Sequence, residues 1–209
     1  MRAQPLIALA RDIKNKRVLA ARQAAPRHEF VPAIYRSLAY TDQPLPIGYG
    51  QTISQPYIVA FMTEKLDPQP TDRALEIGAG SGYLAAVLSR LVAEVYAMEI
   101  VEPLARQAQD TLDRLGYHNV KISWANGQLG WPAEAPFDKI IISCAAPSVP
   151  QRLIDQLKEG GRLIAPIGSF NSQELLVAQK IDGRLVSENL IAVRFVPMTG
   201  DEAPDADPV

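Results

Sequence analysis

The sequence predicts an α/β fold: a mostly parallel twisted sheet, helices on both of its faces, and an antiparallel strand pair near the C-terminus. Three observations support this prediction. From residue 73 onward, short apolar runs alternate with helical apolar patterns, as is typical of β-α-β units. A glycine-rich turn at 78–82 joins one such strand to a helix. Asp182-Gly183 separates two strand-like runs, which indicates a β-hairpin.

The first 55 residues are expected to form a helical cap and a substrate loop ahead of the sheet. Apolar residues at helical spacing predict a helix over 5–24, ended by Pro26. Residues 40–54 contain two prolines and two glycines, too many breaks for regular structure, so a long ordered loop is expected there. An apolar helical pattern then runs over 56–66.

The remaining elements follow the alternation of strands and helices. Strands are predicted at 73–77, 94–99, 119–123, 138–143, 162–167, 174–180 and 184–193, and helices at 82–92, 103–115 and 149–157. Gly160-Gly161 is expected to separate the last helix from the next strand. Residues 1–200 should form one domain, and the acidic, Pro/Ala-rich residues 201–209 a disordered tail.

Composition and charge narrow the class of protein. The net charge is −2 and no cluster of five or more Lys and Arg residues occurs, so nucleic acid is not expected as a partner. The apolar run at 6–10 is too short for a secretory signal, and no later stretch is long enough to span a bilayer. One cysteine, Cys144, and two histidines leave no disulfide and no metal-ligand pattern. We therefore expect a cytoplasmic, metal-free monomer without a membrane segment.

The glycine-rich turn predicts a cofactor site, because glycines permit tight turns and the close approach of a ligand. Its residues are Gly78, Ala79, Gly80, Ser81 and Gly82. A dinucleotide-binding turn requires a glycine where Tyr83 stands, which disfavours a nicotinamide dehydrogenase. Glu76 would repel a pyrophosphate but suits an ammonium and a sulfonium group, unless it only bonds nearby backbone amides. The pattern favours S-adenosylmethionine.

Other candidate ligand-binding residues lie where later strands end, since ligands bind beyond the carboxyl ends of parallel strands. Glu99 closes the second strand, a place where an acid commonly accepts hydrogen bonds from both ribose hydroxyls. Alternatively, Glu99 is a solvated acid at the N-terminus of the next helix. Ile100, beside it, and Asn126-Gly127, after the third strand, are assigned to the same cofactor site.

The run PLPIGYGQTISQPY at 44–57 resembles the hallmark segment of protein-L-isoaspartate (D-aspartate) O-methyltransferases. The resemblance extends through PRHEFVP at 26–32, the glycine turn, GWP at 130–132, AAP at 145–147 and VRFVP at 193–197, and covers nearly the whole chain except the tail. It implies a Rossmann-like class I methyltransferase fold. It also implies methylation, with S-adenosylmethionine, of the α-carboxylate of isoaspartyl residues in damaged proteins and peptides, which starts their repair through a succinimide.

The resemblance also implies which residues meet the acceptor. Gln51, Thr52, Ile53 and Ser54 would line its site, with the Ser54 hydroxyl bonded to the acceptor carboxylate. Local sequence favours another role for Ser54, because a serine before a Pro-initiated helix is ordinarily its N-cap. Apart from the resemblance, four residues after the fourth strand are expected to form a wall near the cofactor, with backbone groups available to a peptide: Ser143, Ala145, Ala146 and Pro147. A carboxylate is ionised at pH 7, so a catalytic histidine is not required.

One position departs from the family pattern. Residues 125–127 read Ala-Asn-Gly, where the family usually has Gly-Asp-Gly and its aspartate accepts a hydrogen bond from the adenine amino group. Asn126 can accept that bond through its amide oxygen, although more weakly because the group is neutral. Two alternatives to isoaspartyl repair stay open: methylation of ordinary aspartate in a dedicated peptide, and cofactor binding with little activity.

Overall fold

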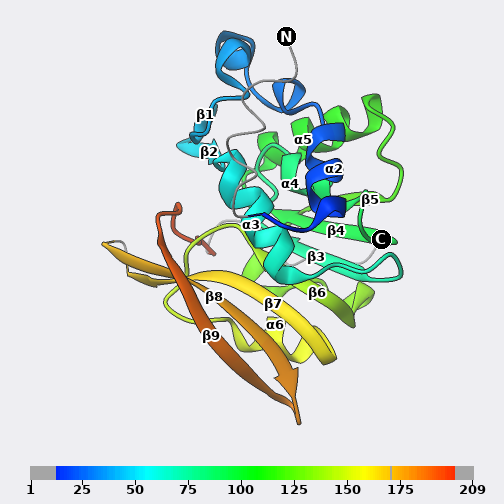
Figure 1. Ribbon diagram of the computed structural model, residues 1–209, viewed down its shortest axis with the longest axis vertical. Coiled ribbons are helices and arrows are strands. Elements are labelled where there is room, and N and C mark those ends of the chain that lie inside the picture. Colours follow the sequence, from blue (N-terminus) through cyan, green and yellow to red (C-terminus); the bar gives the residue numbers. More distant parts are fainter. Residues whose placement is uncertain (1–12, 170, 201–209) are drawn as a thin grey trace.

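A twisted seven-stranded sheet forms the centre of the computed structural model, which describes residues 13–169 and 171–200 (Figure 1). The strand order is β5-β4-β3-β6-β7-β8-β9. Neighbouring strands from β5 to β7 are parallel, and β8 and β9 are each antiparallel to the strand before them. The predicted α/β class is therefore confirmed. The order reverses between β3 and β6, which makes their carboxyl ends the expected place for a ligand.

The strands agree closely with the predicted ranges. Their bounds are β3 (Arg73–Ile77), β4 (Glu94–Glu99), β5 (Val120–Trp124), β6 (Phe137–Ile142), β7 (Leu157–Ser169), β8 (Ser172–Ile181) and β9 (Arg184–Val193). The predicted hairpin is confirmed, since Asp182 and Gly183, both at positive φ, join β8 to β9. The predicted start of β7 is wrong. Gly160-Gly161 lies inside this strand because Leu157 already pairs with Phe137 of β6.

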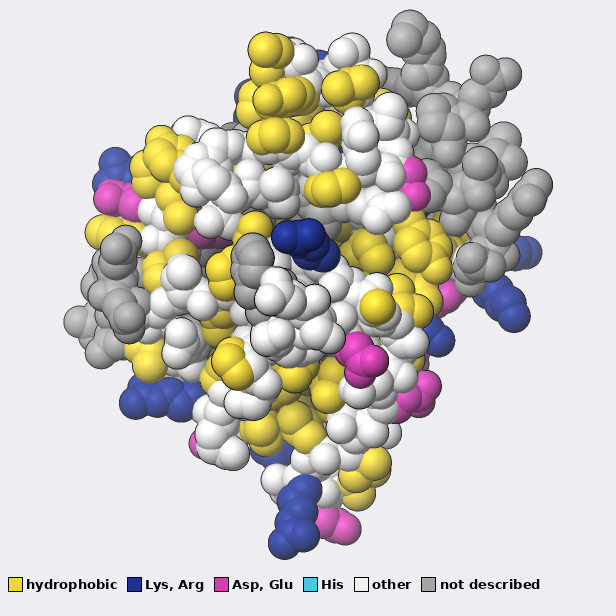
Figure 2. Space-filling view, turned by 90° about the vertical axis from the view of Figure 1, so that its left-hand side faces the viewer, with side chains coloured by type: hydrophobic (Ala, Val, Ile, Leu, Met, Phe, Trp, Pro, Cys, Tyr) yellow, Lys and Arg dark blue, Asp and Glu magenta, His cyan; other side chains and the backbone are white. Residues whose placement is uncertain are grey.

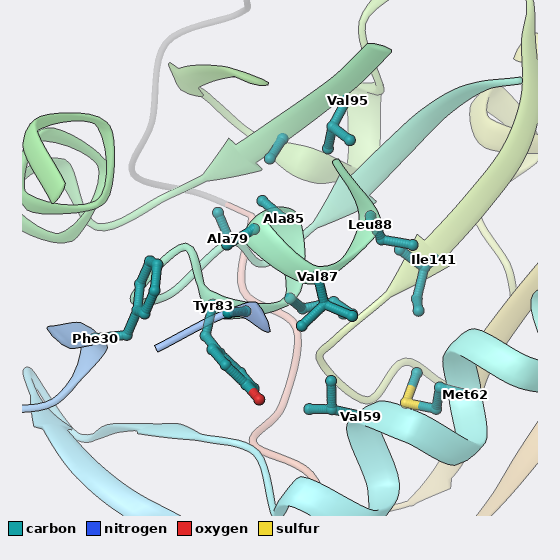
Figure 3. Close-up of a cluster of buried hydrophobic side chains, with 14 of the residues drawn as sticks. Phe30, Val59, Met62, Ala79, Tyr83, Ala85, Val87, Leu88, Val95 and Ile141 are labelled. Carbon is teal, nitrogen blue, oxygen red and sulfur yellow. The ribbon is translucent and has the colours of Figure 1, made fainter. Parts of the chain in front are cut away.

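Helices cover both faces of the sheet, as predicted. Their bounds are α2 (Lys16–Ala24), α3 (Pro56–Leu66), α4 (Tyr83–Leu88), α5 (Glu102–Arg114) and α6 (Gln151–Gln156). Alternate residues of β3 enter two separate hydrophobic clusters, with Ala74 in one and Leu75 in the other. In the cluster drawn in Figure 3, Val87 of α4 lies near Val59 of α3. Leu153 of α6 belongs to the other cluster.

The N-terminal helix is shorter than predicted. It begins at Lys16, because the side chain of Asn15 accepts hydrogen bonds from the backbone N–H groups of Arg17 and Val18 and so caps its first turn. Residues 13–15 are not helical. Residues 5–12 of the predicted helix, and the predicted tail at 201–209, lie outside the described residues.

The loop predicted over 40–54 is wrong in its second half. Residues there form an antiparallel hairpin of β1 (Leu45–Gly48) and β2 (Gln51–Ile53). Gly48, Tyr49 and Gly50 all have positive φ and make the turn, so the two glycines interpreted as breaks reverse the chain. Pro46 lies within β1, opposite Thr52. The hairpin brings the acceptor segment predicted from sequence to the sheet.

Candidate active site

Four adjoining cavities open at the carboxyl ends of β3, β4 and β6. The turn cavity is lined by residues that include Gln51, Thr52, Gly78, Gly80, Glu99, Gly127, Ser143 and Val196. The side cavity, of about 730 Å³, shares Gln51, Ile100, Met198 and Thr199 with it. The outer cavity, of about 490 Å³, is lined by residues that include Thr52, Ser54, Ser143, Arg194 and Val196. The inner cavity is bounded in part by Thr52, Ile53, Ser54, Glu76, Ser81 and Ser143. The structure thus brings the predicted cofactor and acceptor segments together.

The glycine turn needs its glycines for backbone reasons. Gly78, Gly80 and Gly82 have φ values of 87°, 54° and 82°, a region that side chains other than glycine rarely adopt. The backbone N–H groups of Gly78 and Ala79 both donate to the Met98 carbonyl, at 2.9 and 3.0 Å. The turn is therefore fastened to the end of β4 by backbone hydrogen bonds.

Glu76 is a buried acid, 1% exposed, at the end of β3. Its Oε2 atom has no hydrogen-bond partner among the described residues, so this oxygen does not bond backbone amides. Burial, and then the nearby charge of Glu99, raise the pKa of the carboxyl well above its ordinary value. An unpaired buried acceptor beside the glycine turn fits a cationic donor such as the ammonium group of S-adenosylmethionine.

Glu99 closes β4 and holds the turn from the other side. Its Oε2 accepts from Gly80 N at 2.7 Å, and its Oε1 accepts from Val101 N at 2.9 Å. Burial raises the pKa of Glu99, while these backbone bonds lower it. The residue is 5% exposed, so the interpretation as a solvated acid is wrong. Each carboxylate oxygen of Glu99 can accept one more hydrogen bond, so the two oxygens together can bind two ribose hydroxyls.

Asn126 is already engaged in two contacts. Its Oδ1 accepts from Gln128 N at 3.0 Å, and its Nδ2 donates to the Gly200 carbonyl. Residues 196–200, which we call the strap, run past the site, and Val196, Pro197, Met198 and Thr199 line the turn cavity. Asn126 therefore anchors the strap, a role that an acceptor-only aspartate cannot perform. Gly127 is needed for space, since a Cβ there would lie 2.5 Å from Ile77 Cγ2.

The prediction for the wall after β6 is wrong in one respect. The Ala145 N–H donates to the Val196 carbonyl and its own carbonyl accepts from Met198 N–H, at 2.8 and 2.7 Å. Ala146 is bonded in the same way to Pro166 and Gly168. These backbone groups are therefore occupied by the strap and β7 and are not offered to a peptide. Pro147 is exposed.

Cys144 lies directly before this wall and borders the turn cavity. Burial raises the pKa of its thiol to about 12.

Ser54 does not cap α3. The N-cap position belongs to Gln55, which makes no side-chain capping bond. The cap comes from Asp42, whose Oδ1 accepts from Tyr57 N at 3.0 Å and whose Oδ2 accepts from Gln55 Nε2 at 2.7 Å. The segment carrying Asp42 is held in turn by the buried Arg27, whose Nε donates to the Ala39 carbonyl at 2.8 Å. Sequence reasoning missed Asp42 because it lies far outside the local capping pattern.

Replacing Asp42 with alanine should lower the free energy of unfolding by about 0.5–2 kcal/mol, because the first turn of α3 loses its acceptor. Urea denaturation measures the change. Asp42→Asn should retain part of the stability, since its amide oxygen still accepts from Tyr57 N. Asp110→Ala, at an exposed position of α5, is the matched control. A loss for Asp110→Ala equal to that for Asp42→Ala would contradict the capping role.

Replacing Glu76 with glutamine should raise the free energy of unfolding near pH 8 by about 1–3 kcal/mol, because a buried carboxylate without a partner is removed. The folded pKa is raised, so Glu76 favours the folded state below its unfolded pKa and loses that contribution as pH rises through the folded pKa. The gain should therefore vanish at acid pH. Thermal melts across pH, with the exposed Glu188→Gln as control, test this. A gain independent of pH would argue against ionisation as its cause.

Comparisons with known proteins agree with this geometry. The family model described as protein-L-isoaspartate (D-aspartate) O-methyltransferase matches residues 5–203. The chain is 53% identical over 193 residues to protein-L-isoaspartate O-methyltransferase 2 of Nitrosococcus oceani, covering 92% of this chain and 88% of that protein. It is 51% identical over 195 residues to the protein-L-isoaspartate O-methyltransferase of Pelotomaculum thermopropionicum, covering 93% and 85%.

Solved structures give the same result. A protein-L-isoaspartate O-methyltransferase matches with a TM-score of 0.90 and 31% identity, over 97% of this chain and 67% of that one. A protein of the same description from Plasmodium falciparum, in complex with S-adenosyl-L-homocysteine, matches with a TM-score of 0.81 and 27% identity, over 96% and 99%. This chain belongs to the protein-L-isoaspartate (D-aspartate) O-methyltransferase family.

Proposed function

We propose that this protein methylates the α-carboxylate of isoaspartyl residues in damaged proteins and peptides, with S-adenosylmethionine as methyl donor, and so starts their repair through a succinimide. The observation that carries the proposal is the shared border of two cavities. Thr52, Ser143 and Val196 line both the turn cavity, where the cofactor residues lie, and the outer cavity, where Ser54 lies. An acceptor and a methyl donor placed in them are in direct contact across that border.

S-adenosylmethionine supplies an activated methyl group on a positively charged sulfur. The residues present fit this cofactor. Glu76 provides an unpaired buried acceptor for its ammonium group, and Glu99 provides acceptors for the ribose hydroxyls. Gly78 and Gly80 of the turn line the turn cavity without a side chain, and Ile100 and Gly127 complete the site. The sequence analysis assigned Asn126 to the adenine amino group. In the structure, the side chain of Asn126 instead holds the strap beside the site.

The acceptor side positions an ionised carboxylate. Ser54 offers a hydroxyl that makes no hydrogen bond within the part of the chain that the structure describes. Arg194 is the charged residue in the lining of the outer cavity, and its sign favours an anionic acceptor. On the side of the molecule that Figure 2 shows, hydrophobic side chains lie among polar ones, a mixture that suits a peptide. Exclusion of water by these walls favours a step in which opposite charges are neutralised.

The setting of the enzyme is part of the same proposal. We expect residues 1–200 to act as one domain, in the cytoplasm, as a monomer and without nucleic acid. A net charge of −2 and one cysteine support this expectation. No helix in the described ranges 13–169 and 171–200 is long and apolar enough to cross a membrane. Those ranges also contain no group of three or more His, Cys, Asp or Glu residues placed to hold a metal ion.

The activity is tested with labelled S-adenosylmethionine and two peptides that differ only in carrying isoaspartate or aspartate at one position. We expect label in the isoaspartyl peptide alone. In isoaspartate the main chain is one carbon longer and the free α-carboxylate is attached directly to Cα, whereas in aspartate a methylene group separates the free carboxylate from the main chain. Equal labelling would instead indicate a methyltransferase for ordinary aspartate. Label in neither peptide, with S-adenosylmethionine still bound in calorimetry, would indicate cofactor binding without this activity.

The site assignments predict opposite effects for two substitutions. Ser54→Ala should raise the activation free energy for the isoaspartyl peptide by about 1–3 kcal/mol, which lowers kcat/KM roughly 5- to 150-fold. Cofactor affinity should change little. Glu99→Gln should mainly weaken cofactor binding, because it removes a charged acceptor. Calorimetry with S-adenosyl-L-homocysteine and steady-state kinetics separate the two effects. A Ser54→Ala variant that loses only cofactor affinity would refute the assigned role.

A further inference from the structure

Ser143 is a buried hydroxyl that no described residue satisfies. It follows β6, and its backbone N–H donates to the Ile77 carbonyl at 2.8 Å, which continues the pairing of β6 with β3. Its position is therefore set by the sheet, not by a free loop. Its Oγ atom is buried and has no hydrogen-bond partner among the described residues. Buried hydroxyls are normally hydrogen-bonded, so an unpaired one requires an explanation.

The position of Ser143 offers that explanation. Ser143 lines the turn, inner and outer cavities, and only Thr52 among the residues named above does the same. The border between the turn and outer cavities is made by Thr52, Ser143 and Val196. Thr52 is exposed and Val196 is apolar, so Ser143 carries the buried polar atom of this border. A methyl group passing from cofactor to acceptor crosses the same place.

A carboxylate bound in the outer cavity would give the Ser143 hydroxyl the hydrogen-bond acceptor that it lacks. Ser54, which borders both the inner and the outer cavity, lies just after β2, whereas Ser143 lies just after β6. A carboxylate has two oxygens, each able to accept from a hydroxyl donor. Two donors on different elements fix the plane of the carboxylate, which one donor cannot do.

We propose that the Ser143 hydroxyl donates a hydrogen bond to the acceptor carboxylate and, together with Ser54, orients the attacking oxygen toward the methyl group. This inference rests on the proposed function. It assigns a second substrate-binding hydroxyl, directly after β6, to the isoaspartyl site. Because the proposed hydrogen bond goes to the carboxylate of the peptide, its removal should weaken peptide binding more than cofactor binding.

The test is Ser143→Ala, examined by calorimetry and by steady-state kinetics. Binding of an isoaspartyl peptide to protein saturated with S-adenosyl-L-homocysteine should weaken at least fivefold, and kcat/KM should fall by a similar or larger factor. The Kd for S-adenosyl-L-homocysteine should stay within twofold. Ser148→Ala, an exposed serine on the same segment, is the matched control and should change none of these values.

Two further variants separate the hydroxyl from packing. Ser143→Thr keeps a hydroxyl and Ser143→Val replaces it with a methyl group of similar size, so the pair isolates the donor even if the alanine variant folds poorly. We expect the threonine variant to bind the peptide at least fivefold more tightly than the valine variant. Equal peptide binding by this pair, or a loss confined to cofactor affinity, overturns the proposal. If the unaltered protein does not methylate the isoaspartyl peptide, the proposed function itself fails.

Discussion

The bonds between the glycine turn and the end of β4 hold the site together. The Gly78 and Ala79 N–H groups share the Met98 carbonyl, and the Gly80 N–H donates to the Glu99 carboxylate. Three successive residues are thus tied to one strand, and these bonds hold the left-handed backbone of the turn in place. The floor of the turn cavity and the direction of the Glu99 carboxyl both depend on these bonds.

This arrangement brings two acids into an apolar region at some cost to the fold. Glu76 and Glu99 are both buried, and burial raises the pKa of each. Glu99 offsets part of its desolvation through two backbone N–H groups, whereas Oε2 of Glu76 has no such partner among the described residues. A positively charged ligand removes this penalty, so the same residue that weakens the empty fold strengthens binding.

The acceptor side is assembled from segments far apart in the chain. Asp42 caps α3 across the β1-β2 hairpin and so places the residues around Ser54. The strap is held at Ala145 by two backbone bonds and at Gly200 by Asn126. Each of these contacts joins segments that are far apart in the chain. The side of the site that receives a peptide therefore depends on a few polar contacts, while the cofactor side depends on the sheet.

Local patterns determined the elements and the cofactor half of the site. Periodicity predicted β3, β4 and α3, whose bounds match the predicted ranges. Glycine spacing and Glu76 indicated the ligand. These signals act within a few residues of the chain.

The β1-β2 hairpin, the cap by Asp42 and the contact of Asn126 with the strap escaped prediction. Each joins residues that no local period relates, so only packing of the whole chain decides them. The unsatisfied Ser143 hydroxyl belongs with them, because burial and the absence of a partner within the described residues are properties of the tertiary structure alone.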